Sequence, residues 1–150
     1  MSELAVKDKE NILSEERRKE LFKTEYGYFS EDGKEFVITR PDTPRPWANV
    51  ICPGDYGLVV SQAGTGYSWK THASLNRITR WNQDLICEDW GKFIYIRDEE
   101  SKKFWSPTWK PVCQKLESYE CRHGAGYTKF TTKNFFPYHL YKTDKDLFPL

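Results

Sequence analysis

The sequence LESYECRHGAGYTKF, residues 116–130, has the composition of a pair of β-strands. Two runs of strand-forming residues flank a segment with glycines at positions 124 and 126. Glycine adopts the positive φ angles that a tight reversal of the chain requires. The pattern therefore predicts two antiparallel strands joined by a glycine-rich bend.

Further strands are indicated on the amino-terminal side of this pair. Strand character begins near Tyr26 and returns at residues 35–39 and 57–61, with turns at 30–33 and 52–55. Residues 93–97 read as a strand that turns at 98–102 into Phe104–Trp105. Helical periodicity is absent after residue 25. The sequence predicts an all-β, antiparallel β-sandwich.

Length and charge exclude several classes of protein. A chain of 150 residues is the size of one domain, and its net charge of +1 lacks the basic excess of a nucleic-acid-binding protein. No apolar run is long enough for a membrane span, and the charged amino terminus is unlike a secretory signal. We expect a soluble, cytoplasmic protein with no nucleic-acid or membrane partner. Residues 1–25 form a charged lead-in with a short helix at 14–22, capped by Ser14.

The cysteines and histidines do not have metal-ligand spacing. None of the four cysteines forms a C-x-x-C pair, so we predict no metal site. Cys121 and His123 are close enough in sequence to suggest a thiolate couple. Reduced structural thiols are the favoured interpretation.

Residues 61–85, SQAGTGYSWKTHASLNRITRWNQDL, carry the candidate binding chemistry. Aromatic rings next to guanidinium, amide and carboxylate groups suit a sugar, which stacks on a ring and accepts forked hydrogen bonds. The alternative is an edge strand with solvated polar residues. The candidate substrate-binding residues are Tyr67, Trp69, Arg77, Arg80, Trp81, Asn82 and Asp84.

A proline-rich segment precedes Trp47. Pro41, Pro44 and Pro46 remove backbone donors and favour an extended crossing, which we call the strap (residues 41–46). The strap directs Trp47 either into the core or toward a ligand, and the residues alone leave both possibilities open.

Five motifs in order now resemble a known family. They are YGYFSEDGKEFVITRPDTPRPWANVI (26–51), GYSW (66–69), NRITRWNQD (76–84), YIRDEESKKFWSPTWKPV (95–112) and ECRHGAGYTKF (120–130). Their order and spacing are similar to the amino-terminal domain of cellobiose phosphorylase-type enzymes of glycoside hydrolase family 94, formerly glycosyltransferase family 36. The phosphorylase-like domain of cyclic β-1,2-glucan synthases is similar as well.

The resemblance implies a galactose mutarotase-like supersandwich that is followed, in the family, by a helical linker, an (α/α)₆ barrel and a small β domain. Phosphate attacks the anomeric carbon, a barrel aspartate protonates the leaving sugar, and an α-sugar 1-phosphate is released. Inorganic phosphate is a co-substrate there and no cofactor is implied. The family's catalytic aspartate has no counterpart in this chain, so no catalytic residue is assigned. The implied partners are an oligosaccharide, the barrel in cis or in a partner subunit, and a second copy in a homodimer.

The resemblance covers residues 26–132 and does not extend into the tail. Residues 133–150, KNFFPYHLYKTDKDLFPL, depart from the family pattern. We therefore expect an incomplete sandwich at 26–132, a divergent tail at 133–150, and a fragment of a phosphorylase that is inactive alone. The alternatives are a free-standing carbohydrate-binding module and a structural interaction domain.

Overall fold

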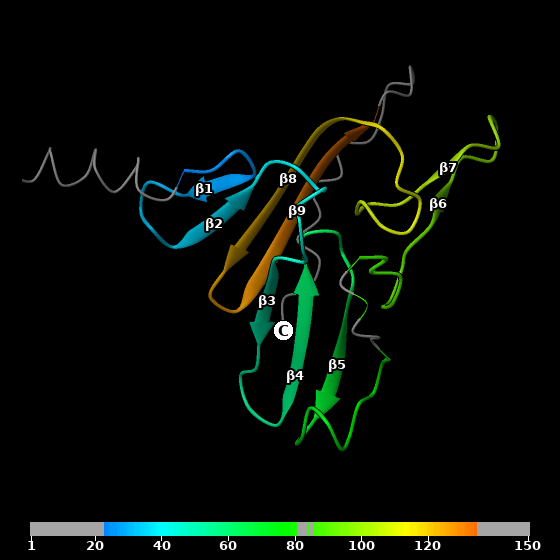
Figure 1. Cartoon of the computed structure of the whole chain (residues 1–150). Helices are drawn as coiled ribbons and strands as arrows, with labels where there is room; N and C mark the ends of the chain where they lie inside the picture. Colours follow the sequence, from blue (N-terminus) through cyan, green and yellow to red (C-terminus); the bar gives the residue numbers. More distant parts are fainter. Residues whose placement is uncertain (1–22, 81–83, 85, 135–150) are drawn as a thin grey trace, which may run out of the picture.

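The computed structural model describes residues 23–80, 84 and 86–134 of the 150-residue chain. These residues form antiparallel β structure without a helix (Figure 1). The strands are β1 (Gly27–Phe29), β2 (Glu35–Ile38), β3 (Ala48–Ile51), β4 (Tyr56–Ser61), β5 (Gly66–Lys70), β6 (Ile96–Arg97), β7 (Phe104–Trp105), β8 (Leu116–Gly124) and β9 (Tyr127–Asn134). The predicted all-β antiparallel fold is confirmed. The helix predicted at 14–22 lies outside the described residues.

The strand pair predicted at 116–130 forms the longest ladder among the described residues. β8 and β9 pair from Leu116↔Asn134 to Gly124↔Tyr127, and Gly126 has a φ of 88° in the bend. β8 also pairs with β2, and β2 with β1, which gives a four-stranded sheet in the order β1-β2-β8-β9.

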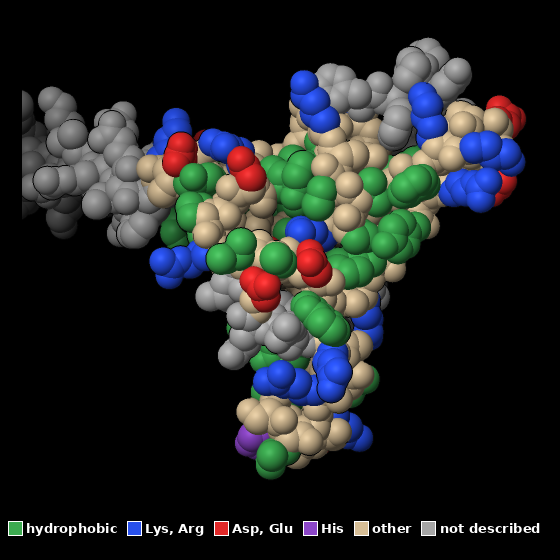
Figure 2. Space-filling model, turned by 45° about the vertical axis from the view of Figure 1, so that its right-hand side comes forward, with side chains coloured by type: hydrophobic (Ala, Val, Ile, Leu, Met, Phe, Trp, Pro, Cys, Tyr) green, Lys and Arg blue, Asp and Glu red, His purple; other side chains and the backbone are tan. Residues whose placement is uncertain are grey.

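Three consecutive strands form a second sheet, in the order β3-β4-β5. The hairpin predicted around residues 98–102 is present, but its first strand is only Ile96–Arg97. Its partner Phe104–Trp105 is equally short because Ser106 and Pro107 follow it, and residues 93–95 therefore have no strand to pair with. Figure 2 shows hydrophobic side chains beside basic ones on the side that carries this hairpin, where Ile94, Tyr95 and Phe104 are exposed.

The core lies on one face of the four-stranded sheet. Alternate residues of β8 point inward, so Tyr119 and Cys121 are buried while Glu120 and Arg122 lie on the other face. They join Ile38 of β2 and Phe130 of β9 in one cluster. On the outer face Arg122 bridges Glu35 and Glu120, with N–O distances of 2.8 and 2.7 Å.

Trp47, which follows the strap, and Asn49 of β3 connect the three-stranded sheet to the four-stranded one. Trp47 packs on Phe36, with ring centroids 5.5 Å apart, which makes it an anchor of the core. Asn49 donates to the carbonyls of Gly124 and Tyr127, at 2.9 Å each. The ring of His123 contacts the Trp47 carbonyl at 2.9 Å. No helix among the described residues has the length and apolarity needed to cross a bilayer.

Candidate functional site

The edge strand β5 presents the aromatic pair of the predicted site. Tyr67 and Trp69 lie on one face with ring centroids 5.4 Å apart. Trp69 is only 8% exposed, because its indole lies over Gly57 of β4, where a Cβ would collide with the ring. Tyr67 is therefore the more accessible of the two rings, and the buried ring of Trp69 packs against it.

Arg77 is held against this pair from the segment that follows β5. Its guanidinium carbon lies 5.1 Å above the Tyr67 ring, and its Nε donates to the Ala73 carbonyl at 2.8 Å. Both contacts restrain the side chain while leaving it exposed. The result is a preoriented guanidinium beside an aromatic face, which we call the β5 edge site (Tyr67, Trp69 and Arg77).

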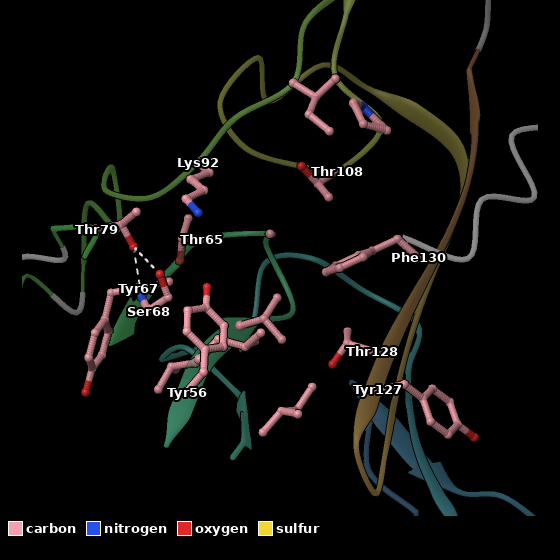
Figure 3. A pocket seen from close by; sticks show the side chains of 18 of the residues that line it. Tyr56, Thr65, Tyr67, Ser68, Thr79, Lys92, Thr108, Tyr127, Thr128 and Phe130 are labelled. Atoms are coloured by element: carbon pink, nitrogen blue, oxygen red, sulfur yellow. Dashed lines mark hydrogen bonds between the residues drawn. The ribbon is translucent and has the colours of Figure 1, made fainter. Parts of the chain in front are cut away.

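Thr79 fixes the segment that carries Arg77. Its hydroxyl accepts from the Ser68 amide at 2.8 Å and contacts the Ser68 hydroxyl at 3.2 Å (Figure 3). The amides of Ile78 and Thr79 donate to the Ser68 carbonyl in turn. Residues 77–79 are thus tied to β5 and keep the guanidinium in register with the rings.

The other predicted site residues are not gathered at the β5 edge site in the described structure. Arg80 is exposed, and Asp84 accepts from the amides of Ile86 and Cys87 at 3.0 Å each. The bond from Cys87, followed by that from Ile86, lowers the pKa of Asp84. Asp84 therefore stabilises a turn, and the described residues show no ion pair between it and Arg80. Trp81 and Asn82 lie outside the described residues.

An apolar cleft opens between the two sheets next to the β5 edge site. Its volume is about 360 Å³, and strands β4, β5 and β9 contribute to its walls. Phe130 and Thr128 line it from β9, while Lys92 and Thr108 lie at its rim (Figure 3). Apolar side chains dominate the lining, so this cleft has the chemistry of a protein interior.

A second cleft, of about 350 Å³, is more polar. We call it the strap cleft, because residues 41–46 form one wall; Gln62, Glu88, Trp109 and Lys110 are among the residues that form the others. Sequence reasoning missed Glu88 and Trp109 as site residues. The one sequence signal for this cleft was the run of prolines in the strap. It predicts a rigid segment but does not indicate which residues lie opposite it.

Cys121 and His123 do not form a reactive couple. The Cys121 sulfur lies 3.8 Å from the His123 ring, but burial raises the pKa of its thiol far above the usual range. Burial also lowers the pKa of His123. A neutral thiol beside a neutral imidazole is a structural contact. Among the described residues, no group of three or more metal-ligating side chains is close enough to hold a metal ion.

Comparison with known proteins places this geometry in context. The family described as "Glycosyl hydrolase 94, supersandwich domain" matches residues 34–135. The N,N'-diacetylchitobiose phosphorylase of Vibrio furnissii is 42% identical over 107 residues, which are 70% of this chain and 13% of that protein. The solabiose phosphorylase of Paenibacillus borealis is 37% identical over 107 residues, 69% of this chain and 14% of that protein.

A cyclic β-(1,2)-glucan synthase, NdvB of Rhizobium meliloti, is 33% identical over 108 residues, 70% of this chain and 4% of that protein. The chain therefore spans a small fraction of the length of the relatives it matches, 13% and 14% for the two phosphorylases above.

Proposed function

This chain belongs to the glycosyl hydrolase 94 supersandwich domain family, and from that premise we propose that it is the non-catalytic, carbohydrate-facing part of a disaccharide phosphorylase. The observation that supports the proposal is the match over residues 34–135, together with 42% identity to a diacetylchitobiose phosphorylase. The parent reaction would be inverting: inorganic phosphate attacks the anomeric carbon of a β-linked disaccharide and releases an α-sugar 1-phosphate.

Catalysis in this proposal belongs to an (α/α)₆ barrel, in cis or in a partner subunit. The phosphorylase relatives are several-fold longer than the matched region, which leaves room for such a barrel in them. The complete enzyme would act as a cytoplasmic homodimer. The chain described here would contribute binding and assembly surfaces, with no general acid and no phosphate site of its own.

The β5 edge site is the surface we assign to sugar contact. Arg77 is exposed but restrained by Tyr67 and by the Ala73 carbonyl, so it loses little side-chain entropy when it binds a hydroxyl. Arg80, Trp81 and Asn82 follow in the chain and extend the same polar-aromatic composition. Substrate or the facing subunit would accept hydrogen bonds from these groups.

A chimera tests this proposal directly. Residues 34–134 of this chain replace the matched region of the Vibrio furnissii phosphorylase, and sugar 1-phosphate release from N,N'-diacetylchitobiose is measured. We expect the chimera to be active. The 150-residue chain alone serves as the negative control and should release no sugar 1-phosphate above a buffer blank.

Substitutions in the chimera then locate the contact. Arg77→Ala, Arg80→Ala and Trp81→Ala should each lower kcat/KM. Loss of a charge-assisted hydrogen bond of about 1.5–3 kcal/mol corresponds to roughly a 10- to 150-fold decrease for the arginines. Arg97→Ala, which removes an exposed arginine on β6, is the matched control. Unchanged kcat/KM in the Arg77 and Arg80 variants would show that this stretch is scaffold.

A further inference from the structure

The strap cleft has rigid walls. Gln62 is 2% exposed, and its side chain binds the strap at its start and just after its end: Nε2 donates to the Pro41 carbonyl at 3.1 Å, and Oε1 accepts from the Trp47 amide at 2.8 Å. On the opposite wall, the Lys110 amide donates to the Ala63 carbonyl at 2.9 Å. Proline rings restrict the strap further. A ligand would find this cavity largely preformed.

Glu88 is the unusual group in this cleft. This residue lines the cavity although it is only 6% exposed, and its backbone has a φ of 48°. A non-glycine residue in this conformation is strained, and such strain persists only where surrounding contacts enforce it. The conformation therefore indicates that contacts around Glu88 fix its backbone.

The described residues satisfy only part of the hydrogen-bonding capacity of Glu88. Among the described residues, the Thr65 hydroxyl is the one side chain that donates to it, at Oε1. A carboxylate has about four acceptor positions, and burying them without donors is costly. Hydroxyl groups of a ligand in the cleft that Glu88 lines can supply further donors to this carboxylate.

The remaining polar groups balance Glu88 in charge. Lys110 donates to the Cys87 carbonyl and to Asp89, while Asp42 pairs with Arg40. Arg45 lines the cleft and is exposed. The cavity thus offers a carboxylate and a guanidinium, both planar, beside proline rings and Trp109. Balanced charge disfavours an anion or a cation as ligand and suits a neutral molecule with several hydroxyls and an apolar face.

We propose that the strap cleft is a saccharide-binding site, separate from the β5 edge site, in which Glu88 accepts and Arg45 donates hydrogen bonds to the hydroxyls of one pyranose ring. The choice of ligand class rests on the proposed function, while the location of the site rests on Glu88 and the cavity. The site would hold a saccharide away from the residues assigned to substrate contact.

Titration of the full 150-residue chain with cellobiose, followed by NMR, tests this site. The Gln62 side-chain amide and the Trp109 indole report on the strap cleft, and the Trp69 indole and Gly66 amide report on the β5 edge site. We expect cellobiose at millimolar concentrations to shift the strap-cleft signals. Glu88→Gln should weaken this binding about tenfold and Arg45→Ala about threefold, as expected for loss of one charged or one partly exposed hydrogen bond.

Glu117→Gln is the matched control, because it removes an exposed carboxylate on β8 that pairs with Lys133 and does not line the strap cleft. If Glu88→Gln does not fold, Arg45→Ala at the exposed rim decides, and unchanged affinity in that variant overturns the proposal. Shifts confined to β5 reporters would also overturn it while leaving the proposed function intact. So would strap-cleft shifts caused by inorganic phosphate but not by cellobiose, or no shifts with either probe.

Discussion

The four-stranded sheet and the β5 edge site differ in how their polar groups are used. On the sheet, Arg122 of β8 binds Glu35 of β2 across 87 positions of sequence, and it also binds Glu120. At the β5 edge site, the side chain of Arg77 instead contacts residues near it in the chain, Tyr67 and Ala73. The sheet arginine satisfies two carboxylates, whereas the edge arginine is left exposed above a ring.

This difference is what we expect if, as proposed above, the β5 edge site serves in sugar contact and the four-stranded sheet in stability. Long-range contacts that bury both partners contribute most to folding, while a local, exposed and restrained cation contributes little to folding and is available to a ligand. Substitutions should therefore fall into two groups, and the following three variants test whether they do.

Tyr119→Ala should have the largest effect on stability. Tyr119 is 8% exposed, belongs to the core cluster with Ile38 and Cys121, and donates its hydroxyl to the Gln62 carbonyl. Truncation of a buried aromatic residue costs about 3–5 kcal/mol. Urea unfolding followed by tryptophan fluorescence measures this loss. A Tyr119→Ala protein whose free energy of unfolding is within about 1 kcal/mol of the wild-type value would show that the four-stranded sheet is not the main source of stability.

Glu35→Gln should have an intermediate effect that depends on pH. Hydrogen bonds from Tyr127 and then from Arg122 lower the pKa of Glu35. In the unfolded chain the pKa of a glutamate is about 4.3. The ionised Glu35 therefore stabilises the fold fully above that pH, and this stabilisation is lost as the pH falls through the lower pKa of the folded state. At pH 7 the variant should be about 1–3 kcal/mol less stable.

Denaturant titrations at neutral and acidic pH measure this difference. The stability gap between wild type and Glu35→Gln should shrink on acidification below about pH 4. Glu117→Gln provides the comparison, because its exposed pair with Lys133 should change stability by less than about 1 kcal/mol at any pH. If the difference in unfolding free energy between the wild type and Glu35→Gln is constant with pH, the ionised carboxylate of Glu35 is not the source of the stabilisation.

Arg77→Ala should have the smallest effect on folding. An exposed cation–π contact contributes about 0.5–1 kcal/mol, so thermal and urea unfolding should be nearly unchanged although turnover in the chimera decreases. A loss of more than about 2 kcal/mol would place Arg77 with the structural residues and erase the distinction between the two regions.

The features that the sequence predicted well depend on neighbours in the chain. The β8–β9 pair and the β6–β7 hairpin have their turn residues between the strands that they join, so local composition is sufficient. Residues 93–95 were misassigned because a strand also needs a partner, and the short strand Phe104–Trp105 provides none for them.

Long-range features could not be obtained from the sequence. Nothing near Trp69 in the chain indicates that Gly57 makes room for its indole, and so its burial was missed. No pattern in the sequence around Glu88 distinguishes it from the other glutamates. Its importance comes from a positive φ and from a cavity wall supplied by the strap, and both depend on the assembled fold. The motifs quoted for the family resemblance supplied the information that local patterns lack.

The strand order also determines when each sheet can form during synthesis. Strands β3, β4 and β5 are consecutive, so their sheet can assemble as soon as residue 70 has left the ribosome. Strands β1 and β2 are made earlier and can pair with each other, but the other edge of β2 pairs with β8, which ends at Gly124 and is made later. The four-stranded sheet is therefore completed after the three-stranded sheet, and in this interval Val37 and Ile38 of β2 are exposed to other nascent chains.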